Sequence, residues 1–379
     1  MKSRRTRLRS ALAVILTVLV LVPTAVLFGR VWQDNANRRD STALEKKGVE
    51  YLTALSPLIS ALVEAQSSAL QGVSAMPASL TAAISQVSAV DVNLGDALRT
   101  KERWAGLQDR IGKLAKVTTG GTAAVYQAHI EVTDLALALY SAVRRNSELN
   151  RDPDNDLSNL QQAVAIDMPT TVVLVSRMGD LANLVSAATA KTRPALAVQF
   201  GQEVLAAQDS VSRLTDSLQA AVDDTNSPTL SGSLVTTLDS FRRGVESMTR
   251  GANPGGTPNS ATMAIAQSSL KTALTSLAGG TLKEMSKLLD DRISTLNSRR
   301  TEAVAMGLLA VVLVLGAVIL LLAGRPRDAA APAAPPAGET TRGDLVASRT
   351  GVYGAGRHDP RPNNGEITPT RQERSGALR

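Results

Sequence analysis

The segment Ser260–Gly324 constrains the fold more than any other part of the chain. Up to Arg300 its apolar residues recur at steps of three and four, the spacing of one buried face of an α-helix. These residues are Leu270, Leu274, Leu277, Leu282, Met285, Leu289, Ile293 and Leu296. The 22 residues of Ala303–Gly324 carry no charge, so they are long enough to cross a bilayer core of roughly 30 Å. No proline interrupts the segment, and we predict one helix with a water-side half and a membrane half.

Two roles fit such a helix. A change in the packed water-side bundle can pass through it mechanically into the membrane, or the helix can be a stalk that only holds a domain at the surface. The apolar stripe slips by one residue at Gly279 and Gly280. We interpret this pair as a candidate hinge. The alternative is a crossing point where another helix comes close, which glycine also permits.

A second uncharged run, Ala11–Gly29, follows a basic leader in residues 1–10. A cleaved signal peptide is one reading of this pattern. The run of 19 residues is longer than a usual signal-peptide core, however, and no small-x-small cleavage motif follows it. We therefore predict an uncleaved transmembrane helix.

The positive-inside rule places the basic leader in the cytoplasm, and two spans return the C-terminus to it. Arg299 and Arg300, at the outer end of the second span, oppose this orientation slightly. We predict a protein of the plasma (inner) membrane with both termini cytoplasmic. Its parts are a leader (1–10), a first span (11–29), an extracytoplasmic domain (30–302), a second span (303–324) and a cytoplasmic tail (325–379).

The composition excludes several classes of function. There is no cysteine, so disulfides, thiolate metal sites and cysteine nucleophiles are excluded. The net charge of +7 arises at the two ends of the chain, because residues 30–302 carry 27 basic and 28 acidic side chains. No basic stripe with interleaved aromatic residues occurs, so the pattern does not indicate a nucleic-acid partner.

Helical patterns fill the outer domain, and no strand pattern competes with them. The first helix is expected to continue from the membrane to about Gln71. Further helical stretches are Pro77–Lys116, Thr122–Asn150, Leu157–Ala187 with an interruption near Met168 and Pro169, Pro194–Val222 and Ser227–Arg250. We predict an all-α protein, an elongated helical bundle of two four-helix layers stacked end to end between two transmembrane helices.

Three sequence segments resemble a known family. Residues 44–52 read LEKKGVEYL and 55–58 read LSPL; residues 94–98 read LGDAL, with Trp104 following; and residues 146–156 read NSELNRDPDND. In this order they resemble the all-helical, four-helix-bundle type extracytoplasmic sensory domain of bacterial transmembrane chemoreceptors and sensor histidine kinases. The most recognisable piece is the turn with Asp152, Pro153, Asp154 and Asp156. The resemblance covers roughly residues 35–190, and it implies a receptor that works as a homodimer.

The chain also departs from that family. The family often has His-Arg-Gly after the proline of its first helix, where this chain has Ala65, Gln66, Ser67 and Ser68. After the aspartate-rich turn it has Leu157, Ser158 and Asn159 instead of a serine and paired tyrosines. No linker module, kinase or methylated coiled coil follows Gly324, so the resemblance implies a cytoplasmic effector on a separate partner.

Few residues suggest chemistry. Asp152, Asp154 and Asp156 alternate as in a calcium loop, but Leu157 and Ala163 stand where that loop needs glycine and glutamate, which favours helix capping. His129 has no second ligand nearby in the sequence. The acids Glu131 and Asp134 are typical of a solvated helix face, and Trp32 of an interfacial anchor. We predict no catalytic site, metal or cofactor.

The tail of residues 325–379 is rich in proline, glycine, alanine and arginine, a composition typical of disorder. Thr340, Thr341, Thr368 and Thr370 lie beside arginine or proline and are candidate phosphorylation sites for a kinase or a phosphothreonine-reading partner. The alternative is a plain solvated tail.

Two functions follow from the sequence. The first is a two-span receptor whose outer bundle detects an extracytoplasmic signal and passes it to a separate cytoplasmic partner. The second is a structural envelope protein or membrane scaffold that binds no ligand.

Overall fold

A computed structural model describes the backbone of residues 2–73, 75–117, 121–150, 155–224, 228–253 and 257–323. Within these ranges the chain is helical apart from short turns, and no strand occurs. The all-α class predicted from the sequence is therefore confirmed. The tail, with Thr340, Thr341, Thr368 and Thr370, lies outside the described residues, as do Asp152, Pro153 and Asp154.

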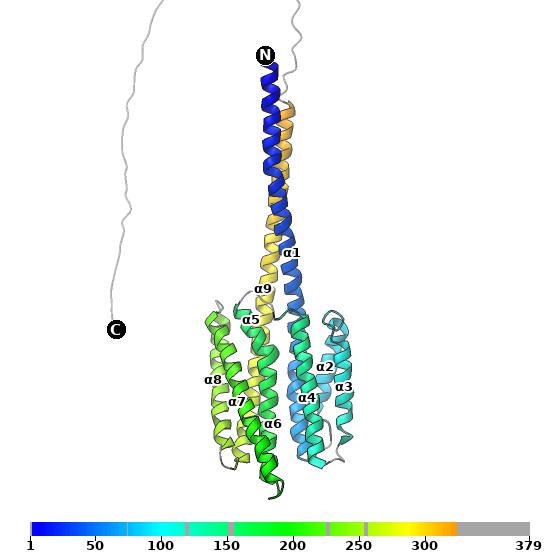
Figure 1. Cartoon of the computed structure of the whole chain (residues 1–379), viewed down its shortest axis with the longest axis vertical. Coiled ribbons are helices and arrows are strands. Elements are labelled where there is room, and N and C mark those ends of the chain that lie inside the picture. The colour runs from blue at the N-terminus through cyan, green and yellow to red at the C-terminus, as the bar shows by residue number, and fades with distance from the viewer. Residues whose placement is uncertain are drawn as a thin grey trace, which may run out of the picture. The chain divides into compact units, whose positions relative to one another are not determined.

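Two long helices begin and end the described chain. Helix α1 (Lys2–Leu70) continues through Pro23 and Pro57, and α9 (Ser260–Ala323) is uninterrupted, as the sequence predicts. They run beside each other in Figure 1. Asn35 Nδ2 on α1 donates a hydrogen bond to the Leu296 carbonyl on α9 at 3.3 Å, and Lys46 pairs with Asp290.

The apolar half of α9 meets the length and composition criterion for a membrane span. Its most apolar 18-residue window has a mean hydropathy of 2.5, and none of that window is buried. In α1 the described side chains between Ile15 and Val31 are also largely exposed, whereas most side chains of residues 1–17 are not described. Phe28 of α1 faces Gly307 of α9, where an added Cβ would lie 3.5 Å from Phe28 Cζ.

The stretch 77–116 forms two helices, α2 (Ala78–Leu94) and α3 (Lys101–Leu114), and not the single helical stretch expected. The buried carboxylate of Asp91 fixes the turn between them. It accepts hydrogen bonds at its Oδ1 from Tyr51 Oη at 2.8 Å and from Thr100 Oγ1 at 2.7 Å. Arg99 adopts φ 52°, the left-handed conformation that reverses the chain.

Helix α4 (Gly121–Asn146) returns along α1 and α3. The next stretch consists of α5 (Asn155–Gln162), a π-helical turn η2 (Ala163–Asp167) and α6 (Met168–Ala187). The interruption expected near Met168 and Pro169 is therefore a widened turn and not a break. Pro169 has no N–H to donate to the preceding turn, a common reason for local rewinding of a helix.

Helices α7 (Arg193–Asp224) and α8 (Pro228–Ala252) complete the fold. In Figure 1, α1 lies with α2, α3 and α4, and α6 lies with α5, α7 and α8. Contacts between α1 and α6 join the two groups. The two groups lie side by side along the same lengths of α1 and α9, so the end-to-end stacking expected from the sequence is not confirmed (Figure 1).

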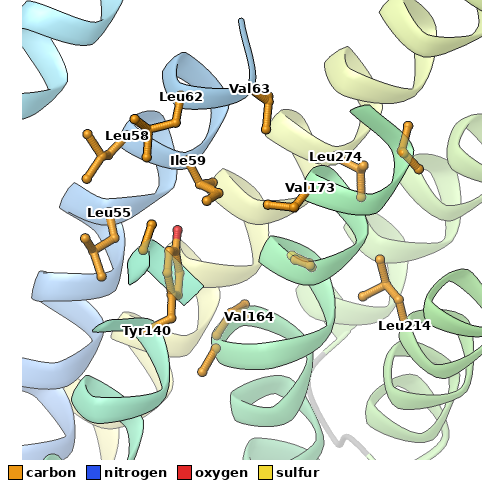
Figure 2. Close-up of a cluster of buried hydrophobic side chains, with 14 of the residues drawn as sticks. Leu55, Leu58, Ile59, Leu62, Val63, Tyr140, Val164, Val173, Leu214 and Leu274 are labelled. Atoms are coloured by element: carbon orange, nitrogen blue, oxygen red, sulfur yellow. The ribbon is translucent and has the colours of Figure 1, made fainter. Parts of the chain in front are cut away.

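One hydrophobic core runs through both groups. Figure 2 shows Leu55, Leu58 and Leu62 of α1 near Tyr140 of α4, with Val164, Val173, Leu214 and Leu274 contributed by η2, α6, α7 and α9. Burial of these side chains, at about 25 cal/mol per Å² of apolar surface removed from water, is the main force that holds α9 to the bundle.

Candidate functional site

A buried polar centre lies where α1 meets α6. Asp180 on α6 is 4% exposed, and its two carboxylate oxygens accept hydrogen bonds from adjacent residues of α1. Gln66 Nε2 donates to Oδ2 at 2.7 Å, and Ser67 Oγ donates to Oδ1 at 2.7 Å. Burial raises the pKa of Asp180 to about 6, although these two hydrogen bonds lower it in part.

Arg177, one helical turn before Asp180, faces α4. Its Nη2 donates to Thr133 Oγ1 at 2.7 Å and to Asp134 Oδ1 at 2.6 Å. Tyr126 of α4 and Glu203 of α7 lie close enough to interact electrostatically with Arg177. Burial raises the pKa of the Tyr126 hydroxyl, and it also raises the pKa of Glu203 against the opposing effect of Arg177. Helices α1, α4, α6 and α7 thus bring polar groups into one region.

Several buried polar atoms in this centre have no hydrogen-bond partner among the described residues. They are Gln66 Oε1, Tyr126 Oη, Arg177 Nε and Glu203 Oε2. Gln66 is completely buried and Arg177 is 9% exposed. A buried polar atom without a partner costs about 1–3 kcal/mol, so a polar molecule that reached these atoms would recover that free energy.

A cleft of about 250 Å³ opens beside the polar centre, between α1, α6 and α9. Ser67 belongs to both, because it lines the cleft and also donates to Asp180. On the α9 side the cleft is lined by Gln267 and Lys271, and Lys271 lies 3.6 Å from Glu64 of α1. Hydroxyl, amide and oppositely charged groups together suit a small polar or zwitterionic ligand.

One wall of this cleft is the helix that reaches the apolar segment. Gln267 Nε2 donates weakly to Ser176 Oγ on α6 at 3.4 Å. Opposite it, Gly179 brings the α6 backbone so close that an added Cβ would lie 2.4 Å from Gln267 Oε1. A ligand that displaced the Gln267 side chain would act directly on α9, roughly 54 Å along that helix from Ala303 at 1.5 Å per residue.

The candidate hinge does not interrupt α9. The helix is regular through Gly279 and Gly280, and Thr281 is completely buried, so the buried face continues through Leu277, Thr281 and Met285. The slip read from the sequence arose because Thr281, a polar residue, occupies the position expected to be apolar. An added Cβ on Gly279 would meet nothing within 4 Å, so no described residue packs closely on Gly279 itself.

The other residues singled out in the sequence lie apart from this cleft. His129 is buried in α4, and burial lowers its pKa to about 4. Asp134 pairs with Arg177, and Glu131 lies 3.8 Å from Arg110. Asp156 lies in α5. Among the described residues no group of three histidine, aspartate or glutamate side chains could hold a metal ion.

Sequence reasoning did not identify the polar centre. In the sequence Gln66 and Ser67 stand out only as a departure from the sensory-domain pattern, and Asp180 lies 114 residues from Gln66. The available signal was an acid flanked by the apolar residues Met178, Leu181 and Ala182, with Arg177 three positions before it. A buried acid requires hydrogen-bond donors, but the local sequence does not identify Gln66 and Ser67 as those donors.

No protein-family model matches this chain, and neither a curated protein nor a solved structure matches it significantly.

Proposed function

We propose that this protein is a two-span membrane receptor whose outer helical bundle detects an extracytoplasmic signal. The observation that carries the proposal is the cleft beside Asp180, because it combines polar ligand-binding groups with a wall formed by α9. A binding event there has a direct structural route toward the membrane.

The route consists of the continuous helix α9 and its contacts with α1. From Gln267 to Ala303 no break or proline interrupts α9. Along this length Lys46 pairs with Asp290, and Arg292 lies 3.5 Å from the buried Glu45. A shift of α9 relative to α1 must change these pairs, so the pairs couple the positions of the two helices.

The output belongs to a separate cytoplasmic partner in this proposal. The support is the resemblance of segments 44–58, 94–104 and 146–156 to the sensory domain of chemoreceptors and sensor kinases, combined with the proline- and arginine-rich composition of residues 325–379. Both termini are cytoplasmic, the receptor is a homodimer, and Thr340, Thr341, Thr368 and Thr370 are the sites at which a kinase acts.

The proposal is tested by a ligand screen on the full chain in detergent, read as thermal stability. A small polar metabolite that raises the midpoint should lose this effect in Gln267→Ala, which removes a cleft-lining side chain. Gln219→Ala is the matched control, because Gln219 is exposed on α7 and bonds only Asp223 of its own helix. A ligand whose effect is unchanged in Gln267→Ala binds elsewhere and would remove this site from the proposal.

A membrane scaffold without a ligand is the second candidate. The observation in its favour is that Gln66 and Ser67 already satisfy both oxygens of Asp180, so the polar centre also fixes how α1 packs on α6. A scaffold predicts no stabilising ligand in metabolite panels, together with an envelope defect when the protein is deleted.

A further inference from the structure

A second cleft lies close to the apolar segments and far from Gln267. It has a volume of about 660 Å³ and is lined by α1 and α9, together with Leu157 of α5. Its lining reaches Val31 on α1 and Ala303 on α9, where the charge-free segments of the two helices meet the water-side bundle. Beyond it, Leu308, Leu313 and other large apolar side chains of α9 are exposed. The cleft therefore has a polar wall and an apolar rim.

The charge of this lining is positive. Four arginines line it, Arg38, Arg292, Arg299 and Arg300, against only two acids. Asp34 is held by Arg38 at 2.9 Å, and Glu45 lies 3.5 Å from Arg292. Neither Arg299 nor Arg300 has a carboxylate partner within the described part of the chain. The cleft consequently carries an excess of two positive charges.

Arg300 is oriented by an aromatic ring. Its guanidinium carbon lies 5.1 Å from the centroid of the Trp32 ring, and Trp32 stacks on Phe28 with ring centroids 6.1 Å apart. Stacking uses the face of a guanidinium and leaves its N–H edge available for hydrogen bonds. That edge fits two oxygens of a phosphate. The hydroxyls of Ser41, Thr42 and Thr295 also line the cleft, but they donate to Glu148 and to the carbonyls of Arg38 and Asp291, so the arginines supply the donors.

We propose that this cleft binds the phosphate of an anionic phospholipid headgroup, with the acyl chains lying along the exposed apolar side chains of α9. This inference rests on the proposed membrane topology. It also accounts for Arg299 and Arg300, which oppose the positive-inside pattern at the outer end of the second span and would otherwise only weaken it. A zwitterionic headgroup binds less well because its quaternary amine meets the same arginines.

Trp32 makes the inference measurable. The full chain is reconstituted in phosphatidylcholine vesicles that contain the same fraction of either brominated phosphatidylglycerol or brominated phosphatidylcholine, and quenching of tryptophan emission is recorded. Trp104, the other tryptophan, is 4% exposed in α3 and supplies an unquenched background. The expected result is several-fold stronger quenching by the brominated anionic lipid. Equal quenching by the two lipids would overturn the inference and leave the proposed topology intact.

Paired variants separate a site from general surface charge. Arg299→Gln with Arg300→Gln should reduce the ratio of the two quenching efficiencies to about one. Arg242→Gln with Arg243→Gln removes the same charge from exposed positions of α8 and should preserve the ratio. Loss of the preference in both pairs would overturn the inference in favour of bulk electrostatic attraction.

The source of the phosphate is distinguished by adding soluble glycerol phosphate at millimolar concentration. The lipid preference should persist, because the acyl chains hold the headgroup at the cleft. Its abolition would overturn the lipid as the ligand and assign the cleft to a soluble phosphate compound. Absence of quenching by either brominated lipid would contradict both this inference and the two-span topology.

Discussion

Gln66 on α1 and Asp180 on α6 are joined by a 2.7 Å hydrogen bond from Nε2 to Oδ2, in a position closed to solvent. The same Gln66 side chain has its Oε1 atom buried without a partner among the described residues. A rotation of the amide would present that oxygen to a protonated or amidated residue 180. This geometry makes the pair sensitive to the protonation of Asp180.

The first prediction concerns the pH dependence of stability. Because the pKa of Asp180 is raised from 3.8 to about 6, the native protein binds more protons than the unfolded chain between these values, and stability falls as the pH rises through them. Asp180→Asn removes this loss. Relative to the wild type, the variant should gain about 2 kcal/mol between pH 4 and pH 7, measured by urea unfolding.

His129 supplies a control of opposite sign. Its pKa is lowered from 6.5 to about 4, so between these values the unfolded chain binds more protons and stability rises with pH. His129→Leu should therefore lose stability relative to the wild type as the pH rises from 4 to 7, again by about 3 kcal/mol. Parallel pH profiles for the two variants would contradict the burial of one or both groups.

The second prediction compares two helical glycines. Gly279→Ala should raise stability by about 1 kcal/mol, since alanine favours a helix and the added Cβ meets nothing within 4 Å. Gly48→Ala should lower it by about 1–3 kcal/mol, since its Cβ would lie 2.4 Å from Ser147 Cβ. Thermal melts of the full chain measure both. If Gly279 and Gly280 form a hinge, the stabilised Gly279→Ala variant should also respond differently to ligand. An unchanged response would show that Gly279 is an ordinary helical residue and not part of a hinge.

The third prediction tests the buried helix faces. Leu214 and Met285 are completely buried, so Leu214→Asp or Met285→Asp places a charge in the core. Either change should cost several kcal/mol, on the order of the free energy of unfolding of the helical domain. Leu205→Asp and Ile265→Asp are matched controls on the same helices, 67% and 70% exposed in the wild type. Circular dichroism during heating distinguishes them. Native stability of either core variant would show that its helix face is assigned wrongly.

The fourth prediction is the topology. Reporter fusions after Arg39 and Asn259 should be active only outside the cytoplasm, and a fusion after Arg349 only inside it, because the positive-inside rule predicts a cytoplasmic location for the basic leader. An external signal from the fusion after Arg349 would refute the two-span arrangement.

The fifth prediction concerns the homodimer. Single cysteines introduced along Ser286–Arg300 of this cysteine-free chain should cross-link in membranes with helical periodicity. Exposed positions such as Asp291, Ser294 and Ser298 should react, whereas Leu289 and Leu296, buried within the bundle, should not. A scan without any cross-linked dimer would support a monomer.

The sequence predicted the long helices well because their signals are local. In α9 the three-four spacing of apolar residues and the absence of proline suffice to predict a continuous helix, because both features can be seen in residues close together in the sequence. The stretch 77–116 was read as one helical stretch because its turn depends on Asp91, whose partner Tyr51 lies 40 residues away. The polar centre was missed for the same reason, since hydrogen bonds between α1 and α6 leave no periodic pattern. At Gly279 and Gly280 the apolar pattern slips in the sequence because the buried residue that continues the helix face, Thr281, is polar.

The π-helical turn Ala163–Asp167 changes the rotation of α5 about the helix axis relative to α6, although the three elements form one continuous helix. A π turn accommodates about one residue more than an α-helical turn, and each residue turns the helix by about 100°. Leu160 of α5 and Thr171 of α6 are both completely buried on either side of it. Deleting one residue from the turn would restore regular winding but swing α5 by about a quarter-revolution, carrying Leu160 out of the core. The extra residue of the π turn therefore allows α5 and α6 to form one continuous helix while each buries its own apolar face against different neighbours.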